Sequence, residues 1–277
     1  MALKDILVHI DNTSYSEKRF KLALQIAKQN EAGLTALFAR ADPSLKGFEP
    51  NMKQRHQAHE ELSAGLQSRF MKLADKAEVK LTWITAKLPS SADQVTNQVI
   101  QQTQQADMII VGQHDHKNAD GSVPDDMPEL LVLETGRPVL IIPYAGDFKT
   151  VGKKVVVAWT PGRESVRALN DALPLMSAAK KVKVVAINPK KKSKKEIGVT
   201  AEQAAAHIAR HGIKTESDQF STRGVDEGNL ILNTLSDERA DLLVMGAYGH
   251  HRFRELILGG VTQKVFENMT TPVLMSH

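Results

Sequence analysis

The stretch Ala240-Asp-Leu-Leu-Val-Met-Gly246-Ala-Tyr-Gly249 is followed, after nine further residues, by Gly259-Gly260-Val-Thr262. The apolar run that ends at Gly246 predicts a buried parallel strand that passes into a ligand-binding loop. Glycines in such a loop lack a Cβ, so backbone N–H groups can come close to a bound oxyanion. Helical spacing of apolar residues over 261–269 then predicts a helix whose N-terminus offers unpaired N–H donors. The order of strand, glycine loop and helix N-terminus predicts a phosphate site.

The sequence contains the same unit twice. Ala106-Asp-Met-Ile-Ile-Val-Gly112 recurs as Ala240-Asp-Leu-Leu-Val-Met-Gly246, an offset of 134 (246 − 112), and Pro138-Val-Leu-Ile-Ile recurs as Pro272-Val-Leu-Met-Ser at the same offset. A short polar segment with two glycines, 144–152, joins the halves. We therefore predict two repeated domains, residues 1–148 and residues 149–277.

Strand-like and helix-like patterns alternate in both halves, which predicts an α/β fold with a parallel sheet covered on both faces. The predicted strands are 6–10, 34–39, 79–85, 108–111 and 139–142, then 155–159, 182–187, 213–220, 242–245 and 273–275. The predicted helices are 16–29, 53–77, 92–105 and 127–134, then 163–178, 201–210, 227–236 and 261–269. Five strands per half suit a doubly wound sheet of order 3-2-1-4-5, in which a ligand crevice lies at the carboxyl ends of strands 1 and 4.

The glycine spacing resembles that of the universal stress protein family, whose nucleotide motif is Gly, two residues, Gly, nine residues, Gly, then Ser or Thr. Gly246, Gly249 and Gly259 match this motif in register. The hydroxyl position is Gly260, a departure, although Thr262 lies two residues further on. The resemblance implies an adenine nucleotide alpha-hydrolase-like fold in each half.

The resemblance also implies that the second half binds ATP or a related adenine nucleotide, with or without Mg²⁺, and hydrolyses it slowly or not at all. In the family an Asp at the end of strand 1 takes part in adenine recognition; the second half has Thr160 there, and the first half has Asp11. The predicted nucleotide contacts are Thr160, Gly246, Gly249, His250, Arg252, Gly259, Gly260, Val261 and Thr262.

The first half departs from the phosphate motif. Applying the offset of 134, Gly249 aligns with Asp115, Gly259 with Asp125, Gly260 with Asp126 and Thr262 with Pro128. Carboxylates repel phosphates, and Pro128 lacks an N–H donor, so we expect no triphosphate in this crevice. Asp125 and Asp126 precede a predicted helix and are interpreted as its N-caps.

Catalytic and metal sites are not predicted. The chain has no Gly-x-Ser-x-Gly turn and no Walker phosphate loop after the first strand of either half. His114 and His116 have a spacing that permits two metal ligands, but four-coordinate geometry needs more partners. Only Asp125 or Asp126, distant in sequence, would be obvious, so we interpret this segment as a solvated loop. His56 and His59, and His207 and His211, are interpreted as solvated helix residues. The lysine-rich segment 190–195 is interpreted as a solvated loop.

Composition excludes several classes of protein. Cysteine is absent, which excludes disulfides and thiolate chemistry, and no apolar run is long enough to span a membrane. The net charge of +4 and 5% aromatic residues do not favour nucleic-acid binding. Since the start of the chain reads as a strand without a secretory signal, we expect a cytoplasmic stress-response protein.

The organisation of the halves is a further expectation. Strands 139–142 and 273–275 end their sheets and need cover, so the two halves are expected to form an internal pseudo-dimer through them, and a homodimer is also compatible with the pattern. The alternative to nucleotide binding is an interaction or assembly protein in which both crevices are empty. Gly260 and Thr160 favour that alternative.

Overall fold

The computed structural model describes residues 2–42, 52–187, 199–221, 224, 226–247 and 260–277. The chain divides into two compact units, Ala2–Asp147 and Phe148–His277, here called the N-terminal unit and the C-terminal unit. None of the helices in these described ranges is long and apolar enough to cross a membrane.

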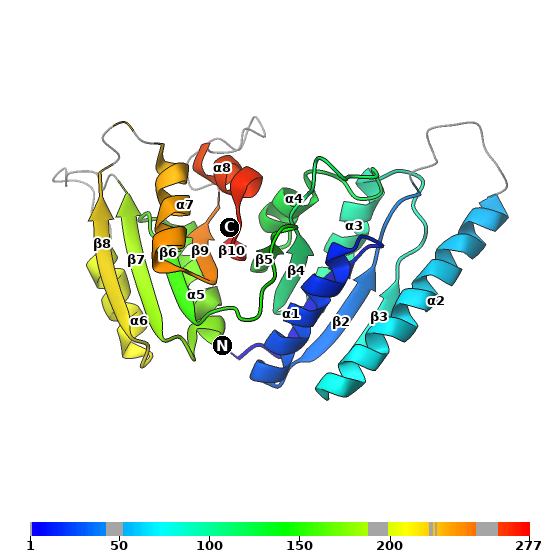
Figure 1. Ribbon diagram of the computed structural model, residues 1–277, viewed down its shortest axis with the longest axis horizontal. Coiled ribbons are helices and arrows are strands. Elements are labelled where there is room, and N and C mark those ends of the chain that lie inside the picture. The colour runs from blue at the N-terminus through cyan, green and yellow to red at the C-terminus, as the bar shows by residue number, and fades with distance from the viewer. Residues whose placement is uncertain (1, 43–51, 188–198, 222–223, 225, 248–259) are drawn as a thin grey trace. The chain divides into compact units, whose positions relative to one another are not determined.

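The N-terminal unit is a five-stranded parallel sheet in the order β3-β2-β1-β4-β5. Helices α1 and α2 pack against each other, and α3 packs against α4, so that both faces of the sheet are covered (Figure 1). The elements are β1 (Asp5–Ile10), α1 (Tyr15–Asn30), β2 (Gly33–Phe38), α2 (Met52–Ala77), β3 (Leu81–Thr85), α3 (Asp93–Gln102), β4 (Met108–Gly112), α4 (Met127–Glu134) and β5 (Val139–Ile142).

The C-terminal unit repeats this topology. Its parallel strands stand in the order β8-β7-β6-β9-β10, which is again 3-2-1-4-5 within the unit. The elements are β6 (Lys154–Ala158), α5 (Arg163–Met176), β7 (Lys181–Ile187), α6 (Ala201–Arg210), β8 (Thr215–Phe220), α7 (Glu227–Glu238), β9 (Leu242–Gly246), α8 (Gly260–Asn268) and β10 (Val273–Ser276). The predicted fold class, two repeated doubly wound units, is confirmed.

The central strands are buried along almost their whole length because helices cover both faces. In β4 only Gly112 is partly exposed, and all four residues of β5 are buried. In α1 the buried residues recur at helical spacing and include Phe20, whose ring centroid lies 4.5 Å from that of Phe70 on α2. Such continuous apolar strands are what a two-sided parallel sheet requires.

Several predicted boundaries were wrong by two residues or more. The strand predicted from Ile213 begins at Thr215, and the helix predicted to end at Ala178 ends at Met176. The strand predicted from Val79 begins at Leu81, because Val79 takes part in the cap that follows α2: its N–H donates to the Ala74 carbonyl oxygen at 3.0 Å. Glu78, with φ of 58°, supplies the left-handed residue that ends this helix. Helix ends of this kind are weakly encoded by apolar periodicity.

Candidate functional site

Each sheet has one point where neighbouring strands lead to helices on opposite faces. It lies between β1 and β4 in the N-terminal unit and between β6 and β9 in the C-terminal unit. In α/β sheets the loops diverge there and leave a crevice outside the carboxyl ends of the strands. The loop predicted to bind phosphate follows Gly246, the last residue of β9, and therefore starts at the crevice of the C-terminal unit.

The crevice of the N-terminal unit contains a buried ion pair between Asp11 and Arg19. Arg19 Nη2 lies 3.1 Å from Asp11 Oδ2, and the side chains are only 3% and 10% exposed. Asp11 Oδ1 accepts hydrogen bonds from the Thr13 N–H at 2.9 Å, from the Thr13 hydroxyl and from the Ser16 hydroxyl. Both carboxylate oxygens of Asp11 are therefore engaged inside the unit.

The electrostatics of this pair are strong. Burial raises the pKa of Asp11, but the Arg19 guanidinium, with the hydrogen bonds from Ser16 and Thr13, outweighs burial and holds that pKa well below its usual range. Burial, then the charge of Arg19, lowers the pKa of His9 to about 4, so its ring is neutral at pH 7. The family resemblance implied that the residue at the position of Asp11 takes part in adenine recognition. In this unit the Asp11 carboxylate forms an ion pair with Arg19 instead.

The loop after β4 is anchored in the same crevice by Asp115. Its Oδ2 accepts from the Tyr15 hydroxyl and from Asn118 Nδ2, each at 2.8 Å, and its Oδ1 accepts from the Lys117 N–H at 3.0 Å. The hollow that remains has a volume of about 70 Å³. Small-molecule sites usually have roughly 300–1,000 Å³, so the enclosed hollow is smaller than a typical ligand site.

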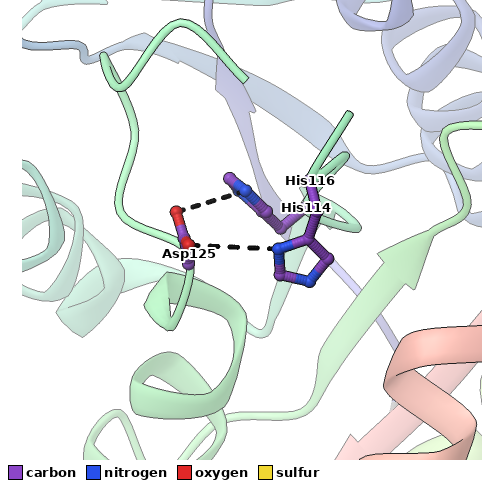
Figure 2. A group of neighbouring side chains, drawn as sticks. All are labelled: His114, His116 and Asp125. Carbon is purple, nitrogen blue, oxygen red and sulfur yellow. Dashed lines mark ion pairs between the residues drawn. The ribbon is translucent and has the colours of Figure 1, made fainter. Parts of the chain in front are cut away.

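Two histidines and a carboxylate meet beside this loop (Figure 2). His114 Nε2 lies 3.2 Å from Asp125 Oδ1, and His116 Nδ1 lies 3.9 Å from Asp125 Oδ2. The centroids of the two imidazole rings are 4.6 Å apart. Burial lowers the pKa of His114, while the charge of Asp125 partly opposes this effect. The residues are distant in sequence, and the loop brings them together.

The interpretation of Asp125 and Asp126 as helix caps was wrong. Asp126 stands at the N-cap of α4 but makes no side-chain capping hydrogen bond. Asp125 faces the two histidines instead (Figure 2). The helix begins with Pro128 in its first turn, which needs no N–H partner and so reduces the need for a cap.

In the C-terminal unit, Gly246 is required by close packing. A Cβ at this position would lie 2.5 Å from the Ser165 backbone nitrogen and 2.6 Å from the Glu164 carbonyl carbon. Both atoms belong to the first turn of α5, so the absence of a side chain lets α5 approach the end of β9. In the N-terminal unit Gly112 makes room for a side chain instead, because a Cβ there would lie 2.3 Å from Arg19 Nη1.

Three polar side chains, Arg163, Glu164 and His277, lie near the end of β9. Glu164 is buried, and its Oε1 accepts from Arg163 Nε at 2.6 Å. Burial raises the pKa of Glu164, but the hydrogen bond and charge of Arg163 outweigh burial and lower it overall. His277 Nδ1 donates to the Ala247 carbonyl oxygen at 3.0 Å, and its Nε2 lies 3.5 Å from Arg163 Nη2.

The structure places some of the predicted nucleotide contacts and leaves others undescribed. Thr160 follows β6 and is exposed, next to the strand that ends at Gly246. Gly260 is the exposed first residue of α8, and a Cβ there would meet no other described atom within 4 Å. Val261 is partly buried, and Thr262 is 5% exposed. The remaining predicted contacts lie outside the described residues: Gly249, His250, Arg252 and Gly259.

Three charged or polar residues in these crevices were not predicted. Arg19 stands on the buried face of α1 with Ser16 and Phe20, and a charge at such a helical spacing is a signal that sequence analysis can use. Glu164 has the same relation to Ala168 on α5. His277 gave no comparable signal, because it follows its strand as a single residue.

The model of the universal stress protein family matches residues 2–143 and again residues 152–277. The chain therefore belongs to the universal stress protein family and carries two such domains. No curated protein matches the sequence.

Solved structures agree with this assignment at the level of the fold. A universal stress protein from Archaeoglobus fulgidus DSM 4304 superposes with a TM-score of 0.75 at 16% identity, covering 98% of this chain and 95% of that chain. A putative universal stress protein from Pseudomonas aeruginosa UCBPP-PA14 superposes with a TM-score of 0.64 at 18% identity, covering 99% and 93%. Both likenesses extend over both units.

Proposed function

We propose that this protein binds one adenine nucleotide, ATP or a close relative, in the crevice of the C-terminal unit. The phosphates lie against the glycine loop and the N-terminus of α8. The nucleotide is held without rapid turnover, and the protein acts as a cytoplasmic stress-response protein. Mg²⁺ accompanies the phosphates where the nucleotide brings it.

The open N-terminus of α8 carries this proposal. Gly260 is exposed, and the described residues leave free space where its side chain would be. A helix N-terminus offers unpaired N–H groups and the positive end of the helix dipole, both of which favour an anion. The helix follows β9 in the chain, and the neighbouring strand β6 leads to Thr160. In the proposal the phosphates contact α8 and the base contacts the end of β6.

The N-terminal unit supplies the contrast. Where the phosphate motif has Gly249, this unit has the anchored carboxylate of Asp115, which repels phosphates, and its enclosed hollow of about 70 Å³ is smaller than a typical ligand site. Asp11 is engaged by Arg19. The proposal therefore assigns nucleotide binding to one unit only.

A pair of glycine substitutions tests the proposed site. Gly249→Asp imports the residue of the N-terminal unit and places a carboxylate where phosphates approach, so ATP binding measured by calorimetry should be lost. Gly65→Asp is the matched control: Gly65 lies on exposed α2, and a Cβ there meets nothing within 4 Å. Unchanged ATP affinity in Gly249→Asp, with an intact circular dichroism spectrum, contradicts the proposal.

A gain of affinity tests the same site from the other direction. Gly260→Ser restores the hydroxyl of the family motif at a position with space for it. One added hydrogen bond to a charged phosphate contributes roughly 1.5–3 kcal/mol, about a tenfold or greater gain in affinity. Equal affinities in the variant and the wild type argue against phosphates at α8.

The alternative is an assembly protein with two empty crevices. Its specific support is the packing role of Gly246, which explains this glycine without a ligand. Protein purified without added nucleotide and then denatured should release an adenine nucleotide, detected by absorbance and chromatography, if the proposal holds. If neither released nor added nucleotide is found to bind, the assembly function is favoured.

A further inference from the structure

We propose that His114, His116 and Asp125 of the N-terminal unit bind a divalent transition-metal ion of the zinc type. The inference is independent of nucleotide binding, because the site lies in the unit to which no nucleotide is assigned. It rests on the convergence of these three side chains in the loop between β4 and α4 (Figure 2).

The distances suit a metal ion with little rearrangement. The three candidate ligand atoms all lie within 4.8 Å of one another, and the two histidine nitrogens are 3.2 and 3.9 Å from oxygens of Asp125. Zinc binds imidazole nitrogen and carboxylate oxygen at about 2.0–2.2 Å in tetrahedral geometry, which places ligand atoms about 3.4 Å apart. Small rotations of exposed side chains close the remaining difference.

The loop already holds the histidines in position. Asp115, between them, is tied to the Tyr15 hydroxyl, the Lys117 N–H and the Asn118 side chain. Figure 2 shows the side chains of His114 and His116 pointing toward Asp125. These contacts fix the loop between the two histidines, which reduces the conformational entropy that metal binding would otherwise cost.

The donor set selects the class of ion. Two imidazoles with one carboxylate suit Zn²⁺ and its neighbours in the first transition row, whereas Mg²⁺ and Ca²⁺ prefer oxygen ligands throughout. The side chains of His116 and Asp125 are each 69% exposed, and that of His114 is 12% exposed, so an ion reaches the site from solvent. Three protein ligands leave one position for water or an exogenous ligand.

The ion would fasten the loop after β4 to the start of α4. His114 and His116 follow β4, and Asp125 lies two residues before Met127, the first residue of α4. Bridging them closes the loop, which stabilises the folded unit for as long as the ion is bound.

The test uses tag-free full-length protein titrated with ZnCl₂ in competition with a chromophoric chelator. The wild type should bind one Zn²⁺ per chain, and its thermal midpoint should rise with Zn²⁺ but not with Mg²⁺. Removing a hydrogen-bond partner of a metal ligand typically costs roughly 10–100-fold in metal affinity. His114→Ala and Asp125→Asn each remove a ligand itself, so each should weaken Zn²⁺ binding by more than that.

Two controls separate this site from incidental binding. Asp126→Asn removes the adjacent carboxylate, which makes no capping hydrogen bond, and should leave zinc affinity unchanged. His207→Ala/His211→Ala removes a histidine pair at the C-terminal end of α6 whose ring centroids are 5.0 Å apart, and should also leave zinc affinity unchanged. Loss in these controls equal to that in Asp125→Asn overturns the proposal.

A spectroscopic readout does not depend on any variant folding well. Co²⁺ added to the wild type should give the intense visible absorption of a low-symmetry, four- or five-coordinate ion, displaced by one equivalent of Zn²⁺. An octahedral, weakly absorbing Co²⁺ spectrum, or zinc binding no tighter than that of His114→Ala, overturns the proposal.

Discussion

At the scale of single residues, the Asp11–Arg19 pair shows how a family position can acquire a structural role. Arg19 Nε donates to the His9 carbonyl oxygen at 2.8 Å while Nη2 contacts the carboxylate, so the guanidinium joins the end of β1 to α1. Removing one partner of a buried pair leaves the other charge uncompensated, which is more costly than removing both.

Asp11→Asn should therefore destabilise the N-terminal unit by about 3–5 kcal/mol, whereas Asp11→Asn/Arg19→Met should recover part of that loss. Urea denaturation measures both. Glu78→Gln is the matched control, because its pair with Lys28 is exposed and should contribute about 0–1 kcal/mol. A loss in Asp11→Asn no larger than in Glu78→Gln would show that the pair is not buried in solution.

The pH dependence of this pair has a definite sign. The folded-state pKa of Asp11 is depressed, so its contribution is fully present above the unfolded-chain value of about 3.9 and is lost progressively as pH falls below it. The difference in stability between the wild type and Asp11→Asn should accordingly shrink in acid below about pH 4.

Single residues also mark what sequence analysis could predict. The sequence predicted the end of β9 correctly, because an apolar run that stops at a glycine indicates a strand end. The same pattern did not reveal that Gly246 accommodates the first turn of α5. Sequence analysis named Asp125 only as a distant candidate partner of His114 and His116, because the path of the loop that brings the three together is not encoded in their spacing.

At the scale of secondary-structure elements, α4 contains a carboxyl group in an unfavourable environment. Glu129 lies in its first turn, and Glu129 Oε2 is buried without a hydrogen-bond partner. Burial, with the charges of Asp126 and Asp125, raises the pKa of Glu129 to about 7. In the unfolded chain the pKa of a Glu side chain is about 4.3. Between about pH 4.3 and pH 7 the folded protein therefore binds more protons at Glu129 than the unfolded chain does, so stability falls as pH rises.

Glu129→Gln should therefore raise the thermal midpoint at pH 8, where the change removes a buried charge, by the equivalent of roughly 1–3 kcal/mol. It should change little at pH 5, where Glu129 is already neutral in the folded state. Glu134→Gln, exposed on the same helix, is the control and should shift stability by less than about 0.5 kcal/mol. Equal effects at both pH values would contradict the raised pKa.

The order of helices and strands could be predicted from the sequence, whereas their boundaries were predicted less accurately. Apolar strands buried on both faces gave the right strand sequence in both units. The predicted helix 92–105 ends as an α-helix at Gln102 and continues as a 3-10 turn, Thr103–Gln105, which polar periodicity does not distinguish. The Thr103 hydroxyl donates to the Ile100 carbonyl oxygen at 2.7 Å, a local hydrogen bond that competes with the regular helix.

At the scale of the whole molecule, each unit's own sheet ends on an apolar strand, β5 or β10, buried at all four residues. We predict that these strands cover each other as an internal pseudo-dimer. Hydrogen exchange should then find the amides on both edges of β5 and β10 protected, while analytical ultracentrifugation finds a mass that does not depend on concentration. Fast exchange at alternate amides of β5 would contradict internal pairing, and protection that is lost on dilution would indicate a homodimer instead.

The division of roles between the repeats is the central claim, and the number of nucleotides bound per chain tests it most directly. Equilibrium dialysis of the wild-type protein against labelled ATP, with and without Mg²⁺, should saturate at one nucleotide per chain. Two equivalent sites would contradict the assignment of nucleotide binding to one unit, and saturation at zero would contradict nucleotide binding by the C-terminal unit.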